Sequence, residues 1–424
     1  MSRIPRVALV VLLSALALRC CLAVFDEMHP FFPPHNYVDS QQIHQGALRM
    51  LRAWTDGSPY PPISPGRELS TTLTASVYRL FGPHPLLPRL LNCAIATVAL
   101  WAWYEMSTLL CGSTADLVTL VLLAYWPSNI FFSSQLSKDA LFMLCLVVSL
   151  LPALRTWNNP PTHAGGGFHA LFAIGVIAMV LLGISRPHVV PLVSASLLAG
   201  GTAAAIVHRG DRSRVKVCAI GCAWVLAAAA AFMPLSKLSK RLLGTSTAMP
   251  EIGSSSKTSP RHPPAGPLFS PAELSEYRRS RMESEQRHSV QVMDRRVETI
   301  IFPEAQFKSW WDIVWFLPKT VLYVLYMPLP GFYPLEGKTS RILAAAENVI
   351  LLLLSAVALS GALRGPKGPA MLSLFAFFFL MVPCLALLEF DLGSASRHKL
   401  VYFPAIFPFA AWQIADSFRR LRSR

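Results

Sequence analysis

The chain alternates long apolar runs with short polar segments along its whole length. The apolar runs approach the ~20 residues that a helix needs to cross a bilayer. This pattern predicts an all-α integral membrane protein with about ten to twelve transmembrane helices. The runs cover residues 6–25, 90–110, 116–133, 140–154, 168–185, 188–207, 215–235, 313–331, 343–363, 369–389 and 399–417.

Composition supports this class. Hydrophobic residues make up 53% of the chain and charged residues 14%, whereas soluble proteins carry about 25% charged residues. The net charge of +15 is spread over many loops, which argues against a nucleic-acid partner because such proteins gather their basic residues on one face. The eight cysteines lie in or at the ends of apolar runs. We therefore assign no metal-ligating residues from them.

Basic clusters predict the orientation of the chain, because short cytoplasmic loops are enriched in Lys and Arg. The clusters predicted to be cytoplasmic are Arg3 with Arg6, 208–216, 364–367 and 419–424. The segments 26–85, 134–139 and 390–398 are then on the outer face, so we expect a multi-pass protein of the plasma (cytoplasmic) membrane with active outer loops. Eleven crossings cannot leave both ends on one side. We expect one apolar run to be irregular, either near Arg186 or near Trp310.

Three parts are expected along the chain. Residues 1–235 form a membrane module whose first outer loop is 26–85, residues 236–312 form a long polar loop, and residues 313–424 return to membrane helices. In the first loop, the spacing of apolar residues over Ser70–Leu80 predicts a short amphipathic helix on the membrane surface.

The long polar loop has two contrasting halves. Its Ser/Pro/Gly-rich stretch, 253–267, is expected to be mobile. A helix near 271–300 is expected to follow, because Ser270 and Glu273 match a capping box and Pro271 suits the first helical position.

Several phrases of the sequence resemble one known family. In chain order they are Asp39 to Ala47, Trp54 to Gly57, Tyr60 to Arg67, Val77 to Gly82, Leu90 to Asn92, Tyr125 to Ile130, Ser137 to Asp139 and Arg397 to Pro408. Their order resembles that of GT-C-type polytopic membrane glycosyltransferases, which are polyprenyl-phosphate-sugar dependent and family 39-like or mannosyltransferase-like. One departure is Gln42 and His44 after Asp39, where the family has a second acid and a tyrosine.

The resemblance implies a transferase that moves a sugar from a polyprenyl-phosphate-linked donor to a glycan, lipid or protein acceptor on the outer face. Such a reaction needs a carboxylate as general base and cations that stabilise the phosphate leaving group. Asp39 is our first candidate for the base, and Asp26 and Glu27 compete with it. The candidate cations for the donor phosphate are Arg67, Arg186, Lys237 and Arg397, with His398 adjacent. Asp139, preceded by Lys138, is a candidate second carboxylate of the donor site.

Some alternatives stay open. Asp139 could help to hold a divalent cation, Mg²⁺ or Mn²⁺, or could simply favour the dipole of the helix it begins. Arg186 could bind phosphate, but snorkelling to the interface is the preferred interpretation. A transporter or flippase of a lipid-linked or anionic solute, and a non-catalytic membrane subunit of envelope polysaccharide assembly, are the alternative functions.

Overall fold

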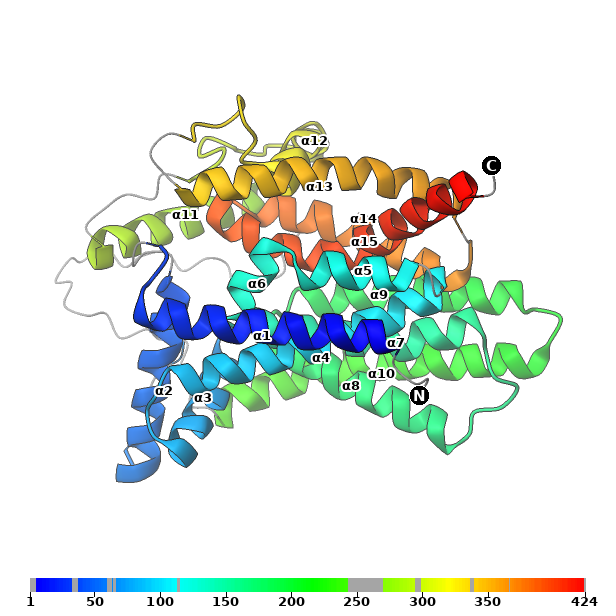
Figure 1. Cartoon of the computed structure of the whole chain (residues 1–424), viewed down its shortest axis with the longest axis horizontal. Helices are drawn as coiled ribbons and strands as arrows, with labels where there is room; N and C mark the ends of the chain where they lie inside the picture. Colours follow the sequence, from blue (N-terminus) through cyan, green and yellow to red (C-terminus); the bar gives the residue numbers. More distant parts are fainter. Residues whose placement is uncertain are drawn as a thin grey trace. The chain divides into compact units, whose positions relative to one another are not determined.

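The computed structural model describes residues 5–32, 37–58, 63, 66–112, 115–242, 270–293, 299–335, 339–365 and 367–422. These segments are almost entirely α-helical, with one isolated antiparallel bridge between Ile300 and Asp391. The helices are α1 (Arg6–Met28), α2 (Val38–Asp56), α3 (Glu68–Phe81), α4 (Leu86–Cys111), α5 (Ala115–Ala124), α6 (Pro127–Ser133), α7 (Asp139–Asn158), α8 (Gly166–Ser185), α9 (Val189–Val207), α10 (Arg212–Leu242), α11 (Pro271–Met293), α12 (Trp310–Tyr326), α13 (Thr339–Arg364), α14 (Pro369–Leu388) and α15 (Leu392–Arg422) (Figure 1).

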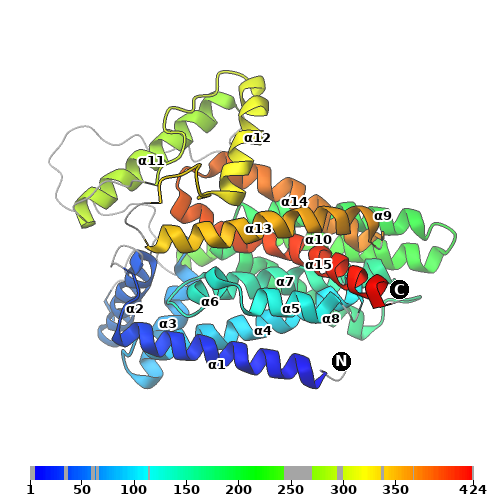
Figure 2. The ribbon, with the colours of Figure 1, turned by 45° about the horizontal axis from the view of Figure 1, so that its top comes forward.

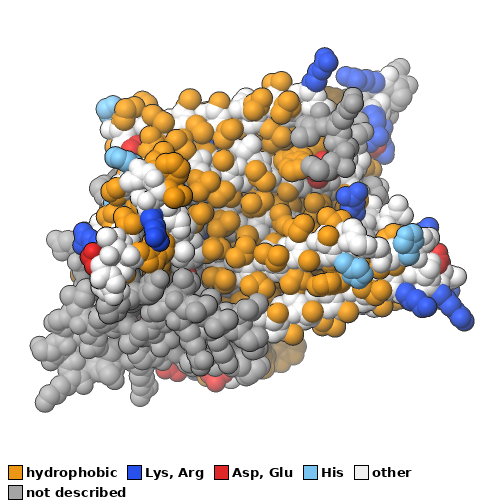
Figure 3. Space-filling view, turned by 90° about the horizontal axis from the view of Figure 1, so that it is seen from below, with side chains coloured by type: hydrophobic (Ala, Val, Ile, Leu, Met, Phe, Trp, Pro, Cys, Tyr) orange, Lys and Arg blue, Asp and Glu red, His pale blue; other side chains and the backbone are white. Residues whose placement is uncertain are grey.

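Eight helices in the described part of the chain are long and apolar enough to cross a bilayer. They are α1, α4, α7, α8, α9, α10, α13 and α14. Many large apolar side chains on them face outward, for example Val10 at 64% exposure and Leu353 at 63%, as expected where lipid is the solvent. Apolar side chains also cover the centre of the face in Figure 3, with Lys, Arg and His towards its ends. The chain is therefore an all-α integral membrane protein.

The irregular crossing is α5 with α6. Taken together, the two helices are long and apolar enough to cross a bilayer, but they are bent by 58° at their junction. If this bent pair counts as one span, the described chain has up to nine spans. Of the two places where we expected an irregular run, the segment around Arg186 separates two ordinary candidate spans, α8 and α9, so that expectation was wrong. Near Trp310, α12 has 17 residues and is too short to count as a candidate span. The helix α15 is also not among the candidate spans.

The break between α5 and α6 has a local cause. Pro127 occupies the first position of α6, where its missing N–H and fixed φ end the preceding helix. Carbonyls at the end of α5 then need other donors. Arg19 Nη1 of α1 donates to Ala124 O at 2.9 Å, and Asn129 Nδ2 donates to Leu123 O at 2.8 Å. Side-chain N–H groups thus donate to the backbone carbonyls that the interrupted helix leaves without a partner.

The helices α2 and α3 of the first long loop pack against each other (Figures 1 and 2). Their close approach depends on Gly46, because a Cβ there would lie 3.0 Å from Thr71 Cγ2. Tyr78 and Ala75 of α3 join Ala47 of α2 in a buried cluster. The amphipathic helix expected over Ser70–Leu80 is present as α3, and its outward face carries Leu80 at 74% exposure.

The chain divides into two units. Unit 1 comprises Met1–Thr247, Leu354–Leu380 and Phe403–Arg424, and unit 2 comprises Ala248–Leu353 and Met381–Tyr402. In unit 2, the expected capping box is present at the start of α11: Glu273 N donates to Ser270 Oγ, and Ser270 N donates to a Glu273 carboxylate oxygen. The stretch 253–267, which we expected to be mobile, lies outside the described residues.

Candidate functional site

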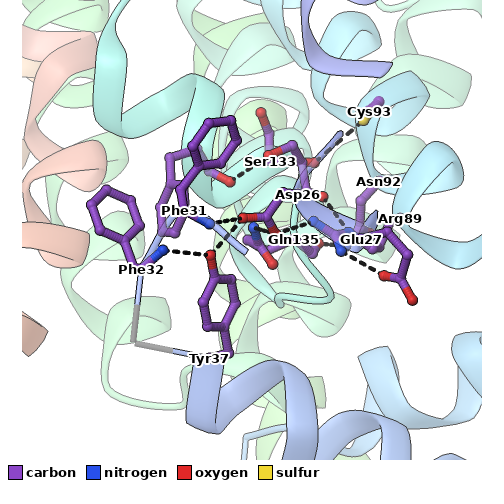
Figure 4. Close-up of polar contacts among 12 residues, drawn as sticks. Asp26, Glu27, Phe31, Phe32, Tyr37, Arg89, Asn92, Cys93, Ser133 and Gln135 are labelled. Carbon is purple, nitrogen blue, oxygen red and sulfur yellow. Dashed lines mark hydrogen bonds and ion pairs between the residues drawn. The ribbon is translucent and has the colours of Figure 1, made fainter. Parts of the chain in front are cut away.

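Asp26, at the end of α1, is the centre of a buried polar network in unit 1 (Figure 4). Arg89 Nη2 lies 2.6 Å from one carboxylate oxygen, which also accepts a hydrogen bond from Gln135 Nε2 at 2.9 Å. The other oxygen accepts from Tyr37 Oη at 2.5 Å and from Phe31 N at 3.2 Å. Four donors therefore hold Asp26 as a carboxylate, which suits a structural anchor better than a proton acceptor.

Glu27 differs from its neighbour in exposure. Arg89 Nη1 lies 2.7 Å from Glu27 Oε2, and the Glu27 side chain is 37% exposed, whereas that of Asp26 is 1% exposed.

Burial and the hydrogen bond to Asp26 raise the pKa of Tyr37 to about 12, so this phenol stays protonated and keeps donating. Arg89 thus joins the end of α1 to the start of α4.

Asp39 forms an ion pair with Arg67. Asp39 lies in the first turn of α2, and Arg67 directly precedes α3. Arg67 Nε donates to Asp39 Oδ1 at 3.0 Å, and Nη2 contacts the same oxygen. Their side chains are 18% and 23% exposed, respectively. This carboxylate is held in place and still reaches solvent.

Arg186 and Asp139 form a second, buried pair. Arg186 Nη2 lies 3.0 Å from Asp139 Oδ1, and the two side chains are 4% and 3% exposed. The Arg186 guanidinium also lies 4.5 Å from the centroid of the Phe142 ring, a favourable cation–π arrangement. Snorkelling was therefore the wrong interpretation of Arg186, since its charge is satisfied within the protein.

The two pairs belong to one cluster. Gly66 has φ +78°, and a Cβ there would lie 2.7 Å from Ser185 O and 3.5 Å from Lys138 Nζ. The loop that carries Arg67 therefore packs directly on the residues before Arg186 and on Lys138. Burial, together with repulsion from Arg186 and Arg67, lowers the pKa of Lys138 to about 7, although Asp139 opposes this shift. We call Asp39, Arg67, Lys138, Asp139 and Arg186, with the adjacent buried Glu68, the charged cluster.

Arg397 and His398 lie in unit 2, near the start of α15. His398 Nδ1 is 2.5 Å from a carboxylate oxygen of Glu389, which is 5% exposed. The next residue, Lys399, is buried and donates to Met327 O at 2.9 Å and to Asn348 Oδ1 at 2.6 Å. These contacts hold the start of α15 within unit 2.

The described residues do not fit a divalent metal as they stand. No group of three His, Cys, Asp or Glu side chains that could hold an ion occurs in the described part of the chain. Asp139, the candidate ligand, accepts from Arg186 instead, and a guanidinium competes directly with a hard cation for carboxylate oxygens.

Sequence reasoning missed several residues that organise these sites. Arg89, Gln135 and Tyr37 surround Asp26, and Glu68 is 5% exposed beside Arg67. A signal existed only for Arg89, an arginine within the first turn of an apolar helix, because such a charge needs a partner. The amide of Gln135 and the phenol of Tyr37 give no sign in the sequence of which acid they contact.

No protein-family model matches the chain, and no curated protein does. Among solved structures, it is similar to the archaeal oligosaccharyltransferase AglB of Archaeoglobus fulgidus in complex with an inhibitory peptide and a dolichol-phosphate, with 14% identity and a TM-score of 0.48. That match covers 98% of this chain and 51% of the other, so the chain spans about half the length of this relative. A second structure is the oligosaccharyltransferase of the same organism tethered to an acceptor peptide, with 14% identity, a TM-score of 0.44, and coverage of 97% of this chain and 50% of the other.

Proposed function

We propose that the chain is a membrane glycosyltransferase that moves a sugar from a polyprenyl-phosphate-linked donor to a hydroxyl of an acceptor on the outer face of the membrane. The observation that carries this proposal is the charged cluster. It combines a partly exposed carboxylate, Asp39, with three basic groups: Arg67 directly before α3, Lys138 at the start of α7 and Arg186 at the end of α8.

In this proposal Asp39 is the general base. It accepts the proton of the acceptor hydroxyl while the hydroxyl oxygen bonds to the anomeric carbon of the sugar. The bond from that carbon to the phosphate oxygen breaks, and the lipid phosphate leaves with the electron pair. Arg67 orients Asp39 through its hydrogen bonds to Oδ1, and fixed geometry of this kind accelerates a reaction between two bound partners.

The basic groups of the cluster would stabilise the leaving phosphate. A guanidinium has five N–H donors, so Arg186 can hold Asp139 and a phosphate oxygen together. Lys138 loses its proton near neutral pH because burial and neighbouring arginines disfavour its charge. A bound phosphate would reverse that balance and restore the charge of Lys138, so binding of the donor and protonation of Lys138 support each other.

The test is transfer by membranes that contain the full-length protein, with radiolabelled polyprenyl-phosphate hexoses as donors. Replacing Asp39→Asn should lower the rate by at least about 100-fold, the usual contribution of a general base. The matched control is Asp211→Asn, because Asp211 also pairs with an arginine, Arg214, but in an exposed turn before α10. Unchanged transfer in Asp39→Asn would remove Asp39 from the mechanism. Loss of transfer in both variants would point to general damage.

A further inference from the structure

Unit 2 contains a cavity of about 270 Å³ between α11 and the segment that leads into α12. Its lining includes Arg278, Arg279, Lys308, Phe302 and Phe307. All the lining residues belong to unit 2, so the cavity does not depend on how the two units are arranged. A cavity of about 270 Å³ has room for a single sugar or a small anion.

Arg278 is the unusual residue of this cavity. It is 3% exposed, and its Nη1 donates to Leu387 O at 2.6 Å and to Glu389 O at 2.7 Å. Its Nη2 is buried and has no hydrogen-bond partner among the described residues. Leaving a buried charged donor without an acceptor costs more than a hydrogen bond contributes, so a ligand oxygen at this atom would relieve that cost.

The charges around Arg278 determine what kind of ligand fits. Arg279 and Lys308 are exposed at the rim, and Glu276 is an acidic member of the lining. Three cations against Glu276 and the nearby Glu389 leave an excess of one positive charge. Burial lowers the pKa of Arg278 to about 10, and the nearby Glu389 opposes the shift, so the guanidinium is charged at neutral pH.

From this buried donor, the basic rim and the size of the cavity, we propose that unit 2 holds a binding site for a small phosphate-bearing ligand. Arg278 at the floor donates from Nη2 to a phosphate oxygen, and Arg279 and Lys308 attract and hold the anion at the rim. Phe302 and Phe307 provide apolar surface for the group attached to the phosphate. The phosphate could belong to a lipid headgroup or to a soluble molecule, and both have the same recognition chemistry. This proposal is independent of the transferase reaction.

The experiment measures equilibrium binding of radiolabelled inorganic phosphate, the probe, to the purified full-length protein. Potassium chloride at equal ionic strength serves as the reference. Binding at one site saturates, and this saturable effect has a half-saturating phosphate concentration equal to the Kd, whereas non-specific association rises linearly with the phosphate concentration. The same protein is then placed in bilayer discs with and without phosphatidic acid, which separates a lipid headgroup from a free phosphate.

The variants Arg279→Gln and Lys308→Gln change only exposed rim residues, so they should fold normally. Each should raise the phosphate concentration at half-saturation by about threefold to tenfold, as expected for the loss of one charge-assisted contact. Arg278→Lys keeps the charge but shortens the donor set, and it should abolish the saturable effect. Arg281→Gln is the matched control, since Arg281 is an exposed arginine of α11 outside the lining.

A further variant separates this site from the charged cluster. A saturable effect that persists in Arg67→Gln and disappears in the Arg279→Gln, Lys308→Gln double variant belongs to the cavity in unit 2. The reverse pattern would assign the effect to the charged cluster and overturn the proposal. Absence of any saturable effect, with inorganic phosphate and with phosphatidic acid alike, would also overturn it. In that case Arg278 serves only to bind the carbonyls of Leu387 and Glu389.

Discussion

Arg89 and Asp26 form a nearly solvent-free ion pair, with 2.6 Å between Nη2 and Oδ2 and with side-chain exposures of 6% and 1%. The pair joins two helices that are separated by more than fifty residues of polar loop. Arg89 also donates from Nε to Ser134 O at 2.9 Å and pairs with Glu27. The base of the first long loop is therefore fixed by one guanidinium.

Replacing Arg89→Gln should destabilise the protein by about 3–5 kcal/mol, because it leaves Asp26 as a buried charge without its partner. The measurement is the midpoint of thermal or denaturant unfolding in detergent. The double variant Arg89→Gln, Asp26→Asn should recover part of the loss, since it removes both charges. A double variant that is less stable than Arg89→Gln alone would contradict this account.

The pH dependence of donor binding should follow Lys138. Its pKa is lowered to about 7, so in the protein without donor it is charged below pH 7 and neutral above. We expect the KM for the donor to rise as pH increases from about 6 to 8.5. Lys138→Arg stays charged throughout and should flatten this profile. A profile that is unchanged in Lys138→Arg would exclude Lys138 as its cause.

The lowered pKa of Lys138 also makes the free energy of unfolding depend on pH. The unfolded chain keeps the usual lysine pKa of 10.5, so between pH 7 and 10.5 the unfolded state binds more protons than the folded state. Unfolding free energy should therefore gain a contribution as pH rises through this window. Lys138→Met should lack that gain, which comparison of unfolding free energies at pH 7 and pH 9 would show.

Gly66 should be intolerant of a side chain. Gly66→Ala places a Cβ 2.7 Å from Ser185 O and requires a positive φ of 78°, so it should displace Arg67 and lower transfer by about tenfold or more, as small misplacements at reacting groups do. Gly57→Ala is the control, because Gly57 also has positive φ, +66°, but no atom of the described residues lies within 4 Å of the added Cβ. It should cost only about 1–2 kcal/mol of backbone strain. Equal loss of transfer in both variants would contradict the packing explanation.

How far the sequence predicts this structure depends on the kind of feature. Apolar runs of span length predict α1, α4, α7, α8, α9, α10, α13 and α14, because burial in lipid requires an apolar helix. The same hydropathy cannot distinguish a straight crossing from a bent one. The signal at α5 and α6 was Pro127, and its effect depends on Arg19, more than one hundred residues earlier.

The charged groups were predicted individually and not as partners. The sequence indicated Asp39 as a base and Arg67 as a phosphate ligand, but their ion pair depends on the packing of α2 on α3, which Gly46 and Thr71 permit. Arg186 was expected to reach the interface, yet it pairs with Asp139 from another helix. Contacts between distant segments depend on tertiary packing, and single-sequence patterns contain no record of it.

Arg19 links the order of synthesis to the placement of α5. Its guanidinium contacts Ala15 O, Ser133 Oγ and Ala124 O, and the residue is fully buried. An arginine at the centre of an isolated helix resists insertion by roughly 2.5–3.5 kcal/mol, and α1 emerges from the ribosome long before Ala124. The contacts with Ser133 Oγ and Ala124 O offset this cost only when α5 and α6 pack against α1, so the broken helix completes the burial of a charge that the first helix brings into the bilayer.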